Sequence, residues 1–323
     1  MAIRWPIRST HATTVRRRAP RWLDSPAPRV AIEIGADAVL AGRVRAAERG
    51  ALRFAQTAVL PLPEGTVTPA AAAPNVLDPE GLAAALRQAL ERVGGLGRDV
   101  VLLLPDLAAR VMLLDFEEIP RRADELAALI RFRLRKTLPF DADAAALSAQ
   151  VLEAGGARSV LAVIADAGRL AEYEAPLERA GARAARVLPA GLAAFMAARE
   201  LNHATLLLRQ EGHALTSAFA WDELPRLFRV VPGAPAASYD DLYPSAAFFR
   251  DFYENHAAGA TAPPRVAAFG VPAALVERLR RDCDWAQVAA APAWPGSLLA
   301  TASPAAENER LLAVAGALMG GLP

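Results

Sequence analysis

The sequence predicts an α/β protein made of two related halves, one of which carries an inserted α/β subdomain. The first observation is a run of three strand patterns within residues 29–60, followed by a helix pattern at 79–93. The second is a weaker copy of this order that begins near residue 204. The third is a separate group of strand and helix patterns between the halves. A repeated meander-plus-helix order favours a duplicated architecture over a simple doubly wound sheet.

The first half is expected at residues 29–108. Its strand patterns lie at 29–35, 39–44, 52–60 and 100–104, and the last is wholly apolar, as in a strand covered on both faces. Asp78 is the expected N-cap of the helix, with Pro79 at the first helical position and Gly94 after its end. A C-terminal helix within 305–321 is expected to complete this half.

The inserted subdomain is expected at residues 109–188 and the second half at 189–304. The insert has the predicted order strand, helix, strand, strand, helix, strand, at 111–116, 124–138, 146–152, 160–165, 168–180 and 184–188. The second half has predicted strands and helices at 190–201, 204–209, 213–220, 226–231, 239–256, 265–269 and 272–283.

Residues 1–28 are expected to form a disordered basic arm, because they are rich in Arg, Pro, Ser and Thr and show little apolar periodicity. Six of the 36 basic residues but one of the 35 acidic residues lie in residues 1–24. Trp5 and Trp22 could enter a headgroup interface while the arginines face anionic lipid. The alternative is a solvated tail without membrane contact.

Composition excludes several classes of function. The remaining body is mildly acidic, so we expect no nucleic-acid partner. Cys283 is the single cysteine, the four histidines show no metal-ligand spacing, and no glycine-rich loop precedes the single lysine, Lys136. We therefore expect no metal and no Walker A site. Without a signal peptide or an apolar stretch of about 20 residues, a cytoplasmic protein is expected.

Four short segments support a family resemblance. They resemble the inserted subdomain of the PilM family of actin-like pilus-assembly proteins: Leu104-Pro105-Asp106, the run from Asp115 to Pro120, Glu125-Leu126 and the run from Lys136 to Phe140. The chain from about residue 29 to 321 is similar to that family, whose relatives include FtsA, actin and sugar kinases. The resemblance implies a duplicated actin-like (ribonuclease H-like) fold with an inserted α/β subdomain.

The nucleotide motifs of that superfamily are degenerate in this chain. Its first turn, Asp-x-Gly-Ser/Thr followed by a lysine, corresponds to Glu33-Ile34-Gly35-Ala36 with Leu40 at the lysine position. The second turn is placed at residues 202–205, which hold neither a carboxylate nor a glycine, and of a later Gly-Gly turn Gly270 remains. Glu33, Gly35 and Gly270 are therefore a vestigial nucleotide site in a cleft expected to be apolar and uncharged. We expect a pseudo-ATPase with no catalytic residue and no cofactor, ATP being the alternative ligand.

The resemblance also implies a partner. In the family, a groove between the insert and the first sheet receives the N-terminal cytoplasmic peptide of the membrane protein PilN. The residues assigned here to such a groove are Phe116, Ile119, Arg131, Leu138 and Phe140. We expect a cytoplasmic scaffold, peripheral to the inner membrane, that binds a PilN-like tail and also contacts pilus motor ATPases.

Two alternatives remain open at this point. One is a divergent actin-like ATPase or sugar-kinase-like enzyme in which Glu33 replaces the aspartate near the metal. The other is the cytoplasmic actin-like region of the secretion protein GspL, whose family ordinarily continues into a membrane helix.

Overall fold

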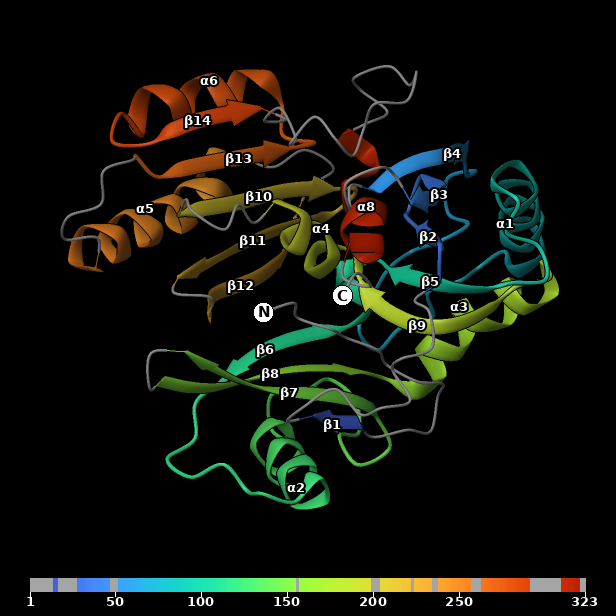
Figure 1. Ribbon diagram of the computed structural model, residues 1–323, viewed down its shortest axis with the longest axis horizontal. Helices are drawn as coiled ribbons and strands as arrows, with labels where there is room; N and C mark the ends of the chain where they lie inside the picture. The colour runs from blue at the N-terminus through green and yellow to red at the C-terminus, as the bar shows by residue number, and fades with distance from the viewer. Residues whose placement is uncertain are drawn as a thin grey trace.

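The computed structural model describes residues 14–16, 28–46, 52–154, 157–198, 204–221, 224–233, 238–256, 263–290 and 309–319. Its strands form three sheets, with the orders β4-β3-β2-β5-β9, β12-β11-β10-β13-β14 and β1-β7-β8-β6. Figure 1 shows the two five-stranded sheets side by side and the four-stranded sheet below them. The chain thus forms two lobes and an insert.

The first lobe is built on a mixed sheet. Its strands are β2 (Val30–Ile34), β3 (Ala38–Ala46), β4 (Leu52–Pro61), β5 (Asp99–Leu104) and β9 (Arg183–Pro189). Helix α1 (Pro79–Val93) packs on β3 and β4, and α3 (Ala167–Arg179) packs on α1 and β9. Asp78 caps α1 as predicted, because its Oδ1 accepts a hydrogen bond of 2.9 Å from the Gly81 N–H.

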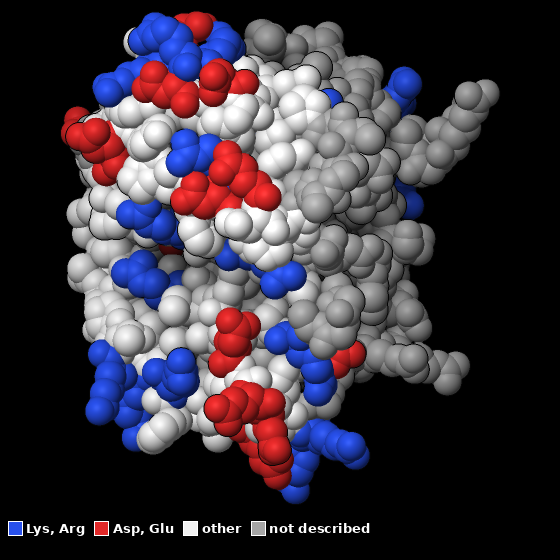
Figure 2. All heavy atoms as spheres, turned by 90° about the vertical axis from the view of Figure 1, so that its left-hand side faces the viewer, with Lys and Arg blue, Asp and Glu red and all other residues white. Residues whose placement is uncertain are grey.

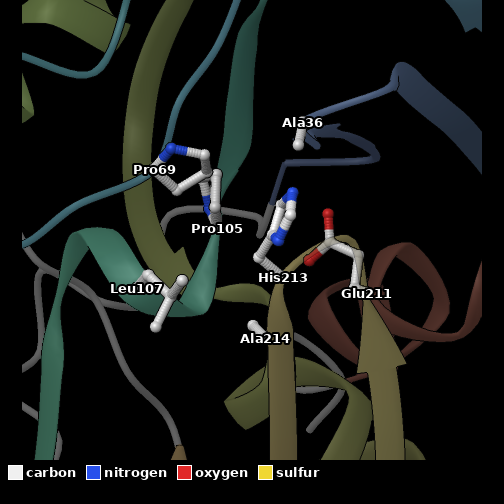
Figure 3. Close-up of a pocket in the computed structure, with 7 residues that line it drawn as sticks. All are labelled: Ala36, Pro69, Pro105, Leu107, Glu211, His213 and Ala214. Carbon is white, nitrogen blue, oxygen red and sulfur yellow. The ribbon is translucent and has the colours of Figure 1, made fainter. Parts of the chain in front are cut away.

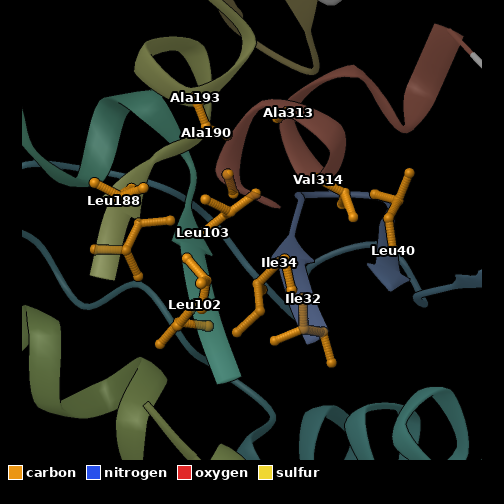
Figure 4. Packing of buried hydrophobic residues seen from close by; sticks show 14 of the residues in the cluster. Ile32, Ile34, Leu40, Leu102, Leu103, Leu188, Ala190, Ala193, Ala313 and Val314 are labelled. Atoms are coloured by element: carbon orange, nitrogen blue, oxygen red, sulfur yellow. The ribbon is translucent and has the colours of Figure 1, made fainter. Parts of the chain in front are cut away.

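Two short apolar helices lie between the lobes. Helices α4 (Ala190–Ala198) and α8 (Leu312–Met319) pack against each other; α8 contacts β2, β3 and β5, and α4 contacts β10 and β11 (Figure 1). A Cβ atom at Gly316 of α8 would lie 1.8 Å from the Ala193 carbonyl oxygen, so only glycine permits this approach. Figure 4 shows Ala193 and Val314 over the buried side chains of β2 and β5. The pair joins the first sheet to the second.

The second lobe repeats the plan. Its strands are β10 (Thr205–Glu211), β11 (Ala214–Trp221), β12 (Leu224–Pro232), β13 (Arg265–Phe269) and β14 (Gln287–Ala290). Helices α5 (Tyr239–His256) and α6 (Ala273–Asp282) bury Leu242, Phe249, Val276 and Leu279 with side chains of this sheet, including Phe219. β14 was not predicted, because its four residues carry one bulky apolar side chain, Val288.

The insert consists of the strands β1 (Thr14–Arg16), β6 (Arg110–Leu114), β7 (Ala146–Ala154) and β8 (Ala157–Ala165) and the helix α2 (Ala123–Leu134). Leu126, Ile130 and Leu134 of α2 pack on Leu147, Ala149 and Ile164 of the sheet. The helix ends at Leu134, four residues before the predicted end at Leu138, because a turn follows in which the Thr137 hydroxyl donates to the Leu134 carbonyl.

Two predicted assignments are corrected by this arrangement. The segment at 168–188 was assigned to the insert, but β9 pairs in parallel with β5, with Leu103 opposite Leu188, so α3 and β9 belong to the first lobe. The apolar end of β9 is buried on both faces there, a position that a small insert does not offer. Within the arm expected to be disordered, Thr14–Arg16 forms β1 on the edge of β7, where unpaired backbone groups are available to it.

The remaining predicted helices fall near their expected positions. The C-terminal helix was expected from residue 305, but α8 begins at Leu312 and residues 305–308 lie outside the described part.

None of the described helices is long and apolar enough to cross a membrane. On the face in Figure 2, acidic and basic side chains are interspersed and form no continuous basic stripe.

Candidate functional site: the cleft between the lobes

Two hairpin turns face each other across the cleft. The β2–β3 turn contains Gly35 and Ala36, and the β10–β11 turn contains Gly212 and His213. A Cβ atom at Gly35 would lie 2.7 Å from the Glu211 Oε1 atom, and one at Gly212 would lie 3.4 Å from the Ala36 Cβ atom. The turns are therefore in near contact.

The position predicted for the second turn is wrong. It was placed at residues 202–205, before β10, but the turn follows β10, as the first turn follows β2. Thr205 opens the strand, whereas residues 202–203 lie outside the described part. Gly270 lies against this strand: its φ is +65°, and a Cβ atom there would lie 2.2 Å from the Gln210 carbonyl oxygen. The turn thus contains a carboxylate and a glycine, Glu211 and Gly212, which the prediction had found missing.

A buried arginine fills the cleft. Arg209 of β10 is 6% exposed, and its guanidinium donates a hydrogen bond to the Glu33 Oε1 atom at the end of β2. Its Nη1 atom lies 3.2 Å from the Glu211 Oε2 atom and 3.7 Å from the Asp106 Oδ2 atom. Glu33 and Asp106 belong to the first lobe, and Arg209 and Glu211 belong to the second. One guanidinium therefore links carboxylates of both lobes.

Asp106 is the second link between the lobes. It stands in the short 3₁₀ helix η3 (Asp106–Ala108) after β5 and is 2% exposed. Its Oδ1 atom accepts a hydrogen bond of 2.6 Å from the Gly191 N–H of α4, and its Oδ2 atom accepts one from the Thr216 hydroxyl of β11. A buried carboxylate needs such partners, so this aspartate positions the first lobe, α4 and β11 relative to one another.

The expectation of an uncharged cleft is therefore wrong. Glu33, Asp106, Arg209 and Glu211, called the ionic cluster below, are charged groups within or beside buried apolar strands. The sequence carried a signal that was not used: Arg209 and Glu211 directly continue the apolar run 206–208, and a charged residue in a buried run requires a partner. Asp106 was noticed as part of a family segment but was given no role.

The cluster holds more acids than bases, and this shifts its pKa values. Burial raises the pKa of Glu33, with a further rise from Asp106, and Arg209 only partly offsets the two. Burial, opposed by Arg209 but reinforced by Glu33, raises the pKa of Glu211 to about 8. Burial lowers the pKa of Arg209, but the three carboxylates outweigh it and raise that pKa. Glu33 Oε2 has no hydrogen-bond partner among the described residues.

The space left beside the cluster is small. A pocket of about 10 Å³ lies between Ala36, Pro69, Pro105, Leu107, Glu211, His213 and Ala214. That is room for about one water molecule, whereas pockets for small ligands measure roughly 300–1,000 Å³. Figure 3 shows Glu211 and His213 pointing toward Ala36 from the second lobe. Within the described residues, no group of three or more His, Cys, Asp or Glu side chains could hold a metal ion. This pocket is therefore too small for a nucleotide.

The residues predicted to bind a partner lie in the insert but at two places. Phe116 and Ile119 precede α2, and Leu138 and Phe140 follow it; all four are half-buried against the core of the insert. Since α2 has 12 residues, or about 18 Å, the two pairs lie toward opposite ends of the helix. Arg131 is held within the insert, because its guanidinium donates to the Ala142 and Ala145 carbonyl oxygens. Binding at these residues stays a prediction.

The fold is of the actin-like class. It has two lobes with matching sheets, two hairpin turns that face each other and an insert after β5. No protein-family model and no curated protein matches the sequence. Among solved structures, the chain is similar to a chain of the PilM–PilN type IV pilus biogenesis complex, with 18% identity over 92% of this chain and 100% of that chain and a TM-score of 0.67. It is also similar to the cytoplasmic domain of EpsL, an inner membrane component of the type II secretion system of Vibrio cholerae, with 15% identity over 90% and 94% of the two chains and a TM-score of 0.50. The predicted actin-like fold is confirmed.

The raised pKa of Glu211 predicts a stability that falls as the pH rises. Its pKa is about 8 in the folded chain and near 4.5 in the unfolded chain, so between these values the folded state binds more protons. The free energy of unfolding should therefore decrease between about pH 5 and pH 8, by up to about 1.4 kcal/mol per pH unit. Glu211→Gln should make the slope shallower, whereas the exposed control Glu117→Gln should not. Equal slopes in urea denaturation of all three proteins would contradict this.

The ionic cluster also predicts strong coupling between Arg209 and Glu33. Arg209→Met leaves the carboxylates without their counter-charge and should cost about 3–5 kcal/mol of unfolding free energy. Adding Glu33→Gln removes one of those carboxylates. The double variant should therefore lose about 1–3 kcal/mol less unfolding free energy than the sum of the losses in the two single variants. The measurement is a double-mutant cycle by urea denaturation. Additive effects would show that the two groups do not interact.

Proposed function

We propose that this protein is a pseudo-ATPase that serves as a cytoplasmic scaffold of a type IV pilus assembly platform at the inner membrane. The observation that carries the proposal is Arg209, whose guanidinium is paired with Glu33 near the end of β2, with Asp106 after β5 and with Glu211 beside the second turn. A nucleotide bound at these strand ends would have to displace the guanidinium from Glu33, Asp106 and Glu211. Removing one partner from a buried ionic cluster leaves the other groups without compensation and costs about 3–5 kcal/mol.

The comparisons support a role in assembly. A chain of similar fold is found in the PilM–PilN complex of type IV pilus biogenesis, and another is the cytoplasmic domain of an inner membrane component of a secretion system. Both comparison proteins are parts of multi-protein systems. By analogy with the first, the proposed partner is the N-terminal cytoplasmic tail of a PilN-like membrane protein. Pilus motor ATPases are proposed as further partners, and the basic arm as a contact with the membrane.

The insert is the proposed docking region for this tail. It carries four half-buried apolar side chains outside its closed core, Phe116, Ile119, Leu138 and Phe140. On the neighbouring surface of α2, Phe132 is 72% exposed. Incompletely covered aromatic and aliphatic side chains of this kind are the anchors that peptide grooves use.

A divergent ATPase is the second candidate. Glu33 stands at the end of β2 beside the first turn, and Gly270 keeps a left-handed turn next to the second. This candidate requires Arg209 to leave the carboxylates and the pocket beside the two turns to widen, because that pocket of about 10 Å³ is too small for a nucleotide.

Peptide binding tests the scaffold function. A fluorescently labelled peptide of the cytoplasmic tail of the PilN-like protein from the same organism should bind the full chain with a Kd in the low micromolar range, by anisotropy. Phe140→Ala should weaken binding at least about fivefold, since anchor residues contribute more than about 1 kcal/mol. Phe248→Ala, an exposed phenylalanine in the second lobe, is the matched control and should leave the Kd unchanged. No detectable binding of the tail would exclude this function.

A further inference from the structure

We propose that the outer end of the first lobe, where β2 and β5 begin and β3 ends, is a membrane-binding surface that docks on anionic lipid headgroups. It is called the arginine patch below and consists of Arg29, Arg43, Arg45, Arg53, Arg92 and Arg98. The inference rests on the proposed location at the inner membrane and adds the face of the folded protein that meets the lipid. That face is distinct from the insert, where the partner tail is proposed to bind.

The register of the first sheet brings these arginines to one end. Arg45 of β3 lies directly opposite Arg53 of β4, and Arg43 lies opposite Val30, the first residue of β2. Arg98 directly precedes β5. Since neighbouring strands lie about 4.8 Å apart, the positions from β4 to β5 span roughly 15 Å. Figure 1 shows β5 and β9 running from the outer side of the first lobe toward the second lobe, so this end points away from the cleft.

The C-terminus of α1 accounts for two of the arginines. A Cβ atom at Gly94, the C-cap, would lie 3.7 Å from the Arg43 Cζ atom, and the Arg98 Nε atom donates a hydrogen bond of 3.0 Å to the Gly94 carbonyl oxygen. Cations are favourable at the carbonyl end of a helix. This role does not extend to the exposed pair Arg45 and Arg53, because like charges directly opposite each other destabilise a sheet. An anion bound over the pair would remove that repulsion.

Neighbouring acids do not neutralise the patch. Among the described residues, its arginines form no ion pair, and the carboxylates near it on the same elements are already paired: Glu91 with Arg87 at 3.3 Å and Asp99 with Arg183 at 2.9 Å. The turn at 47–51 lies outside the described part and adds one acid and one base to the sequence there. The outer end of the lobe therefore carries a strong positive charge, although the body of the chain is mildly acidic.

The form and composition of the patch favour a lipid surface as its occupant. The charges are spread over an exposed end of the sheet, as contact with a planar surface requires, whereas the pocket described above lies at the opposite end. Leu96, between α1 and β5, is 38% exposed, and membrane interfaces accept apolar side chains flanked by basic ones. Clusters of about four to eight basic residues are typical of sites for anionic headgroups. The basic arm joins the fold at Arg29, so the arm and the patch adjoin.

The test is sedimentation of the full chain with vesicles of equal parts phosphatidylglycerol and phosphatidylcholine. Arg45→Gln with Arg53→Gln should weaken binding at least about tenfold, since each basic residue near an anionic surface contributes about fivefold. Arg229→Gln with Arg281→Gln is the matched control, because it makes the same change in net charge at exposed sites of the second lobe, and it should leave binding unchanged. Arg45→Lys with Arg53→Lys keeps both charges and should retain binding.

Two controls exclude other causes of a loss. The midpoint of urea denaturation of Arg45→Gln with Arg53→Gln should not be lower than that of the unchanged protein, because the substitutions remove a like-charge pair from a sheet. Since the basic arm is also proposed to contact the membrane, the same loss should appear in a chain that carries Arg17→Gln and Arg18→Gln. Binding should weaken between about 0.1 M and about 1 M salt, where the screening length falls from about 10 Å to about 3 Å.

Equal sedimentation of the patch variant and the matched control would overturn the proposal. Equal binding to vesicles of phosphatidylcholine alone would also overturn it, as would binding to duplex DNA or polyglutamate in place of vesicles.

The labelled PilN-like tail separates this inference from the proposed function. If the patch variant loses vesicle binding but keeps the Kd for the tail, both are supported. If vesicles bind as expected but the tail does not bind, the lipid surface stands and the proposed partner is wrong. If the tail binds but the vesicles do not, the scaffold function stands and the arginine patch is not a lipid site.

Discussion

The closed arrangement of the two lobes depends on one buried guanidinium. Arg209 reaches from β10 to Glu33 at the end of β2, and Asp106 beside it holds α4 and β11 through Gly191 and Thr216. In an actin-like fold these strand ends point toward each other, so strong like charge there would push the lobes apart. A single internal cation among three carboxylates links the two lobes.

Such a cluster is not simply a source of stability. Taking an arginine and several carboxylates out of water costs several kcal/mol per ion. Well-packed apolar side chains in their place often stabilise a fold equally well or better. What an ionic cluster adds is geometry, because its hydrogen bonds are satisfied in one relative position of the lobes. Burial and the excess of carboxylates raise the pKa values of Glu33 and Glu211.

The fold was largely readable from the sequence, but the site was not. Asp78, Pro79 and Gly94 frame α1 because capping and left-handed geometry depend on nearby residues. The β9 assignment failed because partner choice between strands depends on distant segments, here β5. For the same reason Glu33 was recognised while Arg209 was missed: the first stands in a local motif, whereas the second acquires its role from a carboxylate 176 residues away. The second turn was also predicted before β10, although it follows β10, so the prediction did not connect Glu211 with the site.

The proposed function places partner binding at the insert and not in the cleft. A nucleotide titration tests this most directly: isothermal calorimetry of Mg-ATP against the full chain, with Glu33→Ala as the matched variant. Because Arg209 is already paired with Glu33, Asp106 and Glu211, we predict no saturable heat for either protein at ATP concentrations up to about 1 mM, the upper end of common substrate affinities. Saturable micromolar binding to the full chain that is lost in Glu33→Ala would contradict the account.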